Sequence, residues 1–138
     1  MVLFMQGGEL GGFATIALNR INTTWSADYI LTGTLSNEAA KETAKYGKVN
    51  PLVYPLADRP GSIPDQLSWN LNRDTSYFYY CDNKTVDGVE FPFISNNPHN
   101  VPLVADMSSS TMIKSVYVSK FGLESAILSD YISILIFI

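Results

Sequence analysis

The sequence predicts an α/β protein with a mostly parallel sheet and flanking helices. Apolar runs of strand length alternate along the chain with stretches whose apolar residues recur at helical spacing. Glycine-rich or polar segments separate these runs, and 46% of the 138 residues are hydrophobic, which is enough for about one core. Because parallel strands are joined by crossovers that are usually helical, the alternation favours a parallel sheet.

The first strand-helix unit lies around the stretch FMQGGELGGF, residues 4–13. VLFM (2–5) predicts a buried strand, and FATIALNRI (13–21) predicts a helix with one apolar face, formed by Phe13, Ile16, Ala17 and Ile21. The glycines between them have two interpretations. They could turn backbone N–H groups toward a phosphate at the helix N-terminus, or they could form a tight turn, which the residues alone favour.

A second unit follows directly. DYILT (28–32) predicts a strand, and SNEAAKETAKYG (36–47) predicts a helix that Ser36 caps and Gly47 ends. VNPLVYPL (49–56) predicts an edge strand or a broken strand because it contains two prolines.

Further strands are expected in the second half of the chain. SYFYYC (76–81) is dense in aromatic residues, VEFPFI (89–94) is expected beside it, and VPLVAD (101–106) is another buried run. KSVYVSKFGL (114–123) suggests one more strand. YISILIFI (131–138) is apolar and rich in β-branched residues, which is typical of an aggregation-prone segment.

Composition argues against several classes of partner and compartment. The net charge is −4 and the nine basic residues are scattered, so no nucleic-acid surface is expected. A single cysteine, Cys81, and a single histidine, His99, leave no disulfide and no structural zinc cluster. YISILIFI is shorter than the roughly 20 residues that cross a bilayer, and MVLFM lacks the features of a signal peptide. We therefore expect a cytoplasmic protein without a membrane anchor.

Two polar residues are candidates for ligand contact. Asp106 follows a buried run, and ligands of open α/β sheets lie outside the carboxyl ends of the strands. A helix cap or turn former is an equally weighted alternative for Asp106. Thr85, in CDNKTVDG, could bind a ligand hydroxyl or phosphate, although a turn threonine that bonds its own backbone is more frequent. His99 has no accompanying GxSxG nucleophile motif and is expected in a surface loop. A nucleotide-binding role for GGELGG is weak because its spacing is not GxGxxG.

Several motifs together resemble a known family. In order they are QGGELGGF, ADYILTG, SWNL, SYFYYCDNKTVDGVEF, VADMSS and VSKFG. This order resembles phosphoserine aminotransferase, a pyridoxal-phosphate enzyme of fold-type I, from residue 2 to residue 122. The resemblance implies a partial cofactor-binding large domain over residues 1–122, followed by a divergent apolar tail over residues 123–138. It also implies that the family's N-terminal segment and small C-terminal domain lie outside this chain.

The resemblance assigns roles to particular residues. The glycine turn, here including Glu9 and Leu10, delivers backbone N–H groups to the cofactor phosphate. Thr85 contacts the cofactor near its ring hydroxyl, and Asp106 pairs with the pyridine nitrogen and keeps it protonated, so that the ring can withdraw electrons from the substrate. Leu35 stands where the family has a tryptophan that stacks on the ring.

Some family residues are replaced. Glu9 stands where the family has a third glycine, and its carboxylate could repel the phosphate. No lysine follows Lys120, and the position of the Schiff-base lysine falls near Asp130. No catalytic residue is therefore expected, because an amine nucleophile is needed.

Two functions follow from the resemblance. The first is a phosphoserine aminotransferase-like activity, which exchanges an amino group between glutamate and 3-phosphohydroxypyruvate in serine synthesis and is expected to be inactive in this chain alone. Its substrates are small amino and keto acids, and the parent enzyme is a homodimer with active sites at the interface. The alternative is a non-catalytic fragment that pairs with a full-length subunit.

Overall fold

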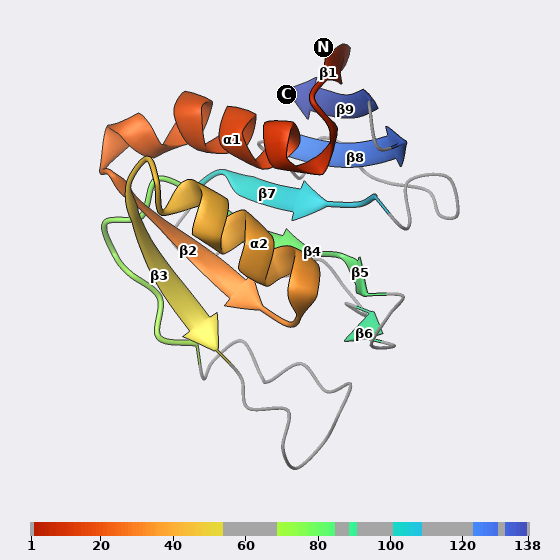
Figure 1. Ribbon diagram of the computed structural model, residues 1–138. Helices are drawn as coiled ribbons and strands as arrows, with labels where there is room; N and C mark the ends of the chain where they lie inside the picture. The colour runs from red at the N-terminus through yellow and green to blue at the C-terminus, as the bar shows by residue number, and fades with distance from the viewer. Residues whose placement is uncertain are drawn as a thin grey trace.

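A seven-stranded sheet forms the centre of the protein (Figure 1). The computed structural model describes residues 2–53, 69–84, 89–90, 101–108, 123–129 and 132–137. The strands of the sheet, in spatial order, are β1 (Val2–Gln6), β9 (Ile132–Phe137), β8 (Leu123–Ser129), β7 (Leu103–Asp106), β4 (Phe78–Cys81), β2 (Ser26–Leu31) and β3 (Lys48–Val53).

Most neighbouring strands in this sheet are parallel. β3, β2, β4, β7 and β8 pair in parallel, whereas β9 runs antiparallel to both β8 and β1. β1 therefore points in the same direction as β8, and every strand except β9 has its carboxyl end at the same edge. The α/β fold with a mostly parallel sheet is confirmed, and β3, which contains Pro51, is an edge strand as expected.

The described part of the strand expected over residues 89–94 does not pair with β4, whose neighbours are β2 and β7. β6 (Val89–Glu90) instead pairs antiparallel with β5 (Asn83–Lys84) in a separate two-stranded sheet. Only four residues separate these two strands, and a parallel pair would need a crossover of about a dozen residues or more. Residues 91–94 lie outside the described residues.

Helix α1 begins earlier than the apolar pattern predicts. It spans Gly8–Arg20, not residues 13–21, and a short 3-10 turn, η1 (Ile21–Thr23), follows it. The backbone N–H of Gly11 donates to the carbonyl of Gly7 at 3.1 Å, so the glycines form the first helical turn. The predicted apolar face is confirmed, since Phe13, Ile16, Ala17 and Ile21 are all buried.

Helix α2 spans Thr34–Thr43 and also begins before the residue expected to cap it. Ser36 lies inside the first turn, where its hydroxyl accepts the backbone N–H groups of Thr32 and Gly33 at 3.0 Å each. The hydroxyl still satisfies donors at the start of the helix, as a capping side chain does, but from the third helical position.

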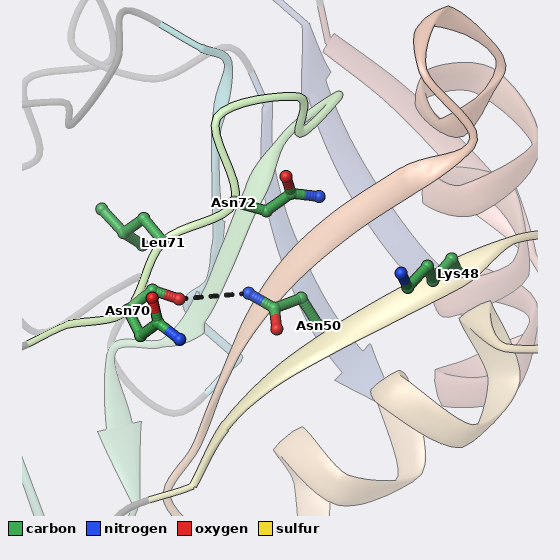
Figure 2. Close-up of a pocket in the computed structure, with 5 residues that line it drawn as sticks. All are labelled: Lys48, Asn50, Asn70, Leu71 and Asn72. Atoms are coloured by element: carbon green, nitrogen blue, oxygen red, sulfur yellow. Dashed lines mark hydrogen bonds between the residues drawn. The ribbon is translucent and has the colours of Figure 1, made fainter.

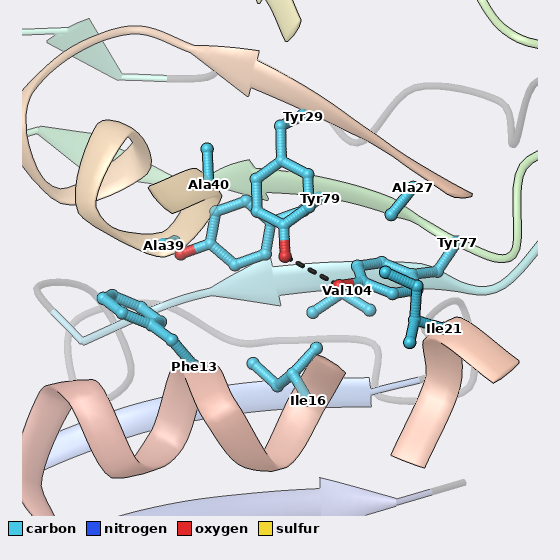
Figure 3. Packing of buried hydrophobic residues seen from close by; sticks show 10 residues of the cluster. All are labelled: Phe13, Ile16, Ile21, Ala27, Tyr29, Ala39, Ala40, Tyr77, Tyr79 and Val104. Carbon is cyan, nitrogen blue, oxygen red and sulfur yellow. Dashed lines mark hydrogen bonds between the residues drawn. The ribbon is translucent and has the colours of Figure 1, made fainter. Parts of the chain in front are cut away.

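Two apolar clusters cover the two faces of the sheet around β2, β4 and β7, as expected for parallel strands. The cluster under α1 and α2 is shown in Figure 3. Its centre is aromatic: the ring of Tyr29 stacks on that of Tyr79 at a centroid distance of 4.6 Å, and Phe13 meets Tyr79 edge-on at 6.3 Å. The cluster on the opposite face is formed by Ile30, Leu52, Trp69, Phe78, Tyr80, Leu103, Ala105 and Met107.

The carboxyl-terminal residues contribute two strands to the sheet. Within the apolar tail expected over residues 123–138, β8 pairs with β7, and β9 lies between β1 and β8. In Figure 1 the two chain ends lie close together for this reason. The expected domain boundary at residue 122 stays a prediction, because strand pairing alone does not test it. No helix in the described part of the chain is long and apolar enough to span a bilayer.

Candidate functional site

The candidate site lies at the carboxyl edge of the parallel strands. β1 ends at the glycine turn, β2 ends before the first turn of α2, and β7 ends at Asp106. In open α/β sheets this edge is where ligands bind. The topology therefore brings the glycine turn and Asp106, which are about 100 residues apart in the sequence, to the same edge of the sheet.

Asp106 is held by donors on both carboxylate oxygens. Its side chain is 1% exposed. Oδ1 accepts the backbone N–H of Ser108 at 3.1 Å and also the Ser108 hydroxyl, while Oδ2 accepts the hydroxyl of Tyr79 at 3.2 Å. The two Ser108 contacts are the local turn that the sequence allowed as an alternative role for Asp106.

Burial dominates the electrostatics of this carboxylate. It raises the pKa of Asp106 above the ordinary value, and the hydrogen bonds from Ser108 and Tyr79 only partly oppose that shift. Burial, together with the nearby Asp106 charge, raises the pKa of Tyr79 well above 10.0. Tyr79 therefore keeps its proton and acts as the donor. A buried carboxylate with a raised pKa is stabilised by any cation that reaches it, which suits a protonated ring nitrogen.

The glycine turn leads from β1 into α1 through unusual backbone angles. Gly7 has φ 145° and Gly8 has φ 60°, a region that favours glycine. A Cβ on Gly7 would lie 3.3 Å from the Cα of Gly11, so the turn is also closely packed. The resulting helix N-terminus points backbone N–H groups at the site edge, an arrangement that suits an anion.

Three of the expected site residues lie near the starts of the two helices. Glu9 is half-buried and belongs to the first turn of α1, where a carboxylate already complements the helix dipole. Leu10 is 57% exposed, so only its backbone suits the expected role. Leu35 is half-buried in the first turn of α2, at the carboxyl end of β2.

Other residues singled out in the sequence cannot be placed. Thr85, His99, Lys120 and Asp130 lie outside the described residues. The expected contact of Thr85 with the cofactor, and the position near Asp130 where a lysine is absent, stay predictions.

Sequence reasoning missed two partners of Asp106. Tyr79 belongs to a run that was interpreted only as a strand, although its alternation places the ring on the same face as the Asp106 side chain. The β4–β7 register pairs Tyr79 with Val104 and Cys81 with Asp106. Ser108 was quoted as part of VADMSS, and its Asp-x-Ser spacing is itself typical of such a turn.

Away from this site, a concavity lies beside the amino-terminal half of β3 (Figure 2). It has a volume of about 220 Å³ and is lined by Lys48, Asn50, Asn70, Leu71 and Asn72. The side-chain amide of Asn50 donates to the buried Asp28 carboxylate at 2.8 Å, and the backbone N–H of Asn72 donates to the same carboxylate at 3.0 Å. These polar groups therefore hold β2, β3 and the segment before β4 together, away from Asp106. The described residues include no group of side chains suited to a metal ion.

Comparison with known proteins identifies similar chains. Residues 1–130 match the family model for class-V aminotransferases. The chain is 52% identical over 121 residues to a phosphoserine aminotransferase of Drosophila melanogaster. The aligned residues cover 88% of this chain and 33% of that protein. It is 43% identical to a phosphoserine aminotransferase of Pseudomonas syringae pathovar tomato, over 88% of this chain and 34% of that protein. This chain thus spans about a third of the length of these relatives.

Solved structures have the same fold. A phosphoserine aminotransferase from Trichomonas vaginalis, described as bound to pyridoxal phosphate, superposes with a TM-score of 0.84 at 31% identity. The superposition covers 99% of this chain and 42% of that one. Because the superposition covers nearly the whole chain, β8 and β9 included, the seven-stranded sheet has the arrangement found in that aminotransferase.

Proposed function

We propose a function for this chain from its family, because the chain belongs to the class-V aminotransferases. It is a phosphoserine aminotransferase-like cofactor-binding segment, with pyridoxal phosphate as its ligand. The parent activity is amino transfer between glutamate and 3-phosphohydroxypyruvate. The single observation that supports this best is the buried Asp106 at the carboxyl end of β7, held on both oxygens.

Asp106 is the proposed partner of the pyridine nitrogen. Its carboxylate is excluded from water, so a proton on the ring nitrogen would be held by a strong, charge-assisted hydrogen bond. Pyridoxal phosphate, when bound, supplies an electron-withdrawing ring for reactions of amino and keto acids. Asp106 supports that chemistry by keeping the proton on the nitrogen.

The glycine turn is the proposed phosphate contact. The backbone N–H groups at the start of α1 and the helix dipole favour a dianion there. Glu9 places a competing negative charge in the same turn, so phosphate affinity should be weaker than with glycine at that position.

Leu35 and Thr85 complete the proposed cofactor contacts. Leu35 offers an apolar contact without an aromatic face, so it contributes less than a stacked ring would. Thr85 is proposed to donate to the ring hydroxyl.

Covalent attachment of the cofactor is not part of this proposal. Asp130, and not a lysine, stands near the position of the family's Schiff-base lysine, so we infer non-covalent binding and no turnover by this chain alone. In the alternative proposal the chain acts without catalysis by pairing with a full-length subunit. Co-purification of a tagged chain with an untagged phosphoserine aminotransferase would favour that alternative.

The test of the proposed function is a binding titration. Pyridoxine 5′-phosphate is the probe, because its alcohol replaces the aldehyde and cannot react with lysine amines. We expect Asp106→Ala to weaken binding by roughly tenfold or more, since a charge-assisted hydrogen bond contributes about 1.5–3 kcal/mol. Asp74→Ala, which removes an exposed aspartate, should bind like the unmodified chain. Equal affinity of both variants would contradict the role of Asp106.

A further inference from the structure

We propose that Tyr79 is a positioning residue that sets which oxygen of Asp106 faces the ring nitrogen, and that this oxygen is Oδ2. The inference rests on the proposed function, since it assumes that Asp106 meets a protonated ring nitrogen. It adds a residue that none of the sequence motifs singled out for the site. Tyr79 does not itself touch the cofactor in this proposal and acts through the carboxylate.

The assignment follows from counting acceptor sites on the carboxylate. Each carboxylate oxygen has two lone pairs. Oδ1 of Asp106 already accepts two hydrogen bonds, both from Ser108, whereas Oδ2 accepts one, from Tyr79 at 3.2 Å. Within the described contacts, Oδ2 is therefore the oxygen with a lone pair available for a third partner.

Tyr79 also fixes the direction of that remaining lone pair. If Ser108 were the only partner, Oδ1 alone would be hydrogen-bonded, and the carboxyl group could still rotate about that contact. A second anchor on Oδ2 fixes the plane of the group, because Tyr79 is rigidly held: its side chain is 0% exposed and its ring stacks on Tyr29. The carboxylate is thus oriented before any ligand arrives, which lowers the cost of ordering it on binding.

The same ring contacts the helix that follows the glycine turn. Phe13 on α1 meets the Tyr79 ring edge-on, with centroids 6.3 Å apart and planes at 86° (Figure 3). Tyr79 therefore contacts both elements that are proposed to bind the cofactor. Its hydroxyl bonds Asp106, and its ring packs against Phe13 on α1. In this proposal, the distance between the phosphate contact and the ring-nitrogen contact depends on the packing of Phe13, Tyr79 and Asp106.

The experiment compares Tyr79→Phe with a matched control, Tyr29→Phe. Both substitutions remove one hydroxyl from a fully buried, stacked ring, but the Tyr29 hydroxyl bonds Thr43 at 2.6 Å and Tyr77 at 2.8 Å instead of Asp106. Two ligands are titrated into each chain: pyridoxine 5′-phosphate, and its 1-deaza analogue, in which carbon replaces the ring nitrogen. The ratio of the two affinities reports the contact between Asp106 and the nitrogen, and largely cancels any loss of phosphate binding.

A second readout needs no cofactor. Carbon-13 labelling of the aspartate carboxyl groups follows the titration of Asp106 by NMR, with Asp106→Asn assigning the signal. Among the described residues Tyr79 is the ionisable group that bonds the Asp106 carboxylate, while Cys81 on β4 and Tyr29 on β2 act on Tyr79, so Tyr79→Phe removes one neutral donor and no charge. We expect the Asp106 pKa to rise in Tyr79→Phe and to stay unchanged in Tyr29→Phe.

The expected result is that the affinity ratio falls by about threefold or more in Tyr79→Phe but not in Tyr29→Phe. A wild-type ratio and an unchanged Asp106 pKa in Tyr79→Phe would overturn the role of Tyr79, while a loss in Asp106→Ala would leave the proposed function standing. If Asp106→Ala itself keeps the wild-type ratio, the proposed function fails and the assignment of Oδ2 fails with it. Circular dichroism of each variant shows whether the sheet is retained, and a variant without it is replaced by Tyr79→Met, which also lacks the donor.

Discussion

Gly47 lies against Ile21 so closely that no side chain fits between them. A Cβ on Gly47 would lie 2.5 Å from Cδ1 of Ile21 and 3.0 Å from the carbonyl oxygen of Trp25. Ile21 ends the apolar face of α1, and Gly47 precedes β3. This single contact therefore joins the connection after α1 to the start of the edge strand.

Replacing Gly47 by alanine should destabilise the chain. The added methyl group must displace Ile21 or the backbone at Trp25, and overpacking of this kind costs about 1–3 kcal/mol. Urea unfolding followed by circular dichroism measures the change. The matched control is Gly11→Ala in α1, where a Cβ would have nothing within 4 Å, so the higher helix propensity of alanine should stabilise by roughly 0.5–1 kcal/mol. Equal effects of the two variants would contradict the packing argument.

Replacing Asp106 by asparagine should stabilise the chain increasingly as the pH rises. Burial raises the Asp106 pKa above its ordinary value of 3.8, so between these two pKa values the folded chain binds more protons than the unfolded chain. The stability of the unmodified chain therefore falls as the pH rises through this range, by about 1.4 kcal/mol for each unit of pKa difference. Asparagine carries no charge and can still accept from Ser108 and donate to the Tyr79 hydroxyl.

The measurement is urea unfolding of both chains from pH 4 to pH 7. The stability of Asp106→Asn relative to the unmodified chain should increase with pH and level off above the folded pKa. Asp74→Asn, at an exposed position, serves as the control for the loss of an aspartate side chain. An advantage that shrinks with rising pH would mean that the buried carboxylate is stabilised by a cation in the folded chain.

Much of the fold and part of the site could be predicted from the sequence. The apolar face of α1 and the strand ending at Asp106 follow from local patterns, which depend on neighbours a few residues apart. The early start of α1 at Gly8 was missed because glycines usually interrupt helices, whereas here Gly7 and Gly8 adopt the positive φ angles that lead into one.

The parts that could not be predicted depend on contacts between distant residues. Tyr79 and Asp106 are 27 positions apart, and only the β4–β7 register brings the hydroxyl to the carboxylate. The insertion of β9 between β1 and β8 joins the two ends of the chain, and no local pattern in YISILIFI indicates which strands it pairs with. Strand order in a sheet is set by such non-local pairing.

Pyridoxal phosphate should leave no site-directed covalent adduct on this chain. No lysine follows Lys120, so no amine is expected at the position near Asp130. After incubation, borohydride reduction and digestion, mass spectrometry should detect only low-level adducts on exposed lysines such as Lys41, which is 72% exposed. These adducts should be the same in Asp106→Ala. A single stoichiometric adduct that disappears in Asp106→Ala would contradict the prediction and would identify an alternative attachment site.

Removing residues 131–138 should lower the soluble fraction of the chain. The composition of YISILIFI alone predicts the opposite, because an apolar, β-branched segment without charge promotes aggregation when it is exposed. In the fold, however, residues 132–137 form β9, which pairs with β1 on one side and β8 on the other. The truncated chain would therefore leave β1 without a partner in the described sheet and would expose one edge of β8, and unpaired edges template association.

Hydrogen exchange distinguishes the two possibilities residue by residue. In the full chain the backbone amides of Val2–Gln6 that pair with β9 should be protected, whereas in the truncated chain they should exchange like those of an unfolded segment. The amides of β2, which pairs with β3 and β4, should keep their protection in both chains and serve as the internal control. Ile134→Pro gives the same test without a deletion, because Ile134 pairs with Phe4 and Ala126 and proline removes a ladder donor from an interior strand. A truncated chain that is more soluble, with β1 still protected, would mean that β9 is dispensable and that its apolar composition alone governs aggregation.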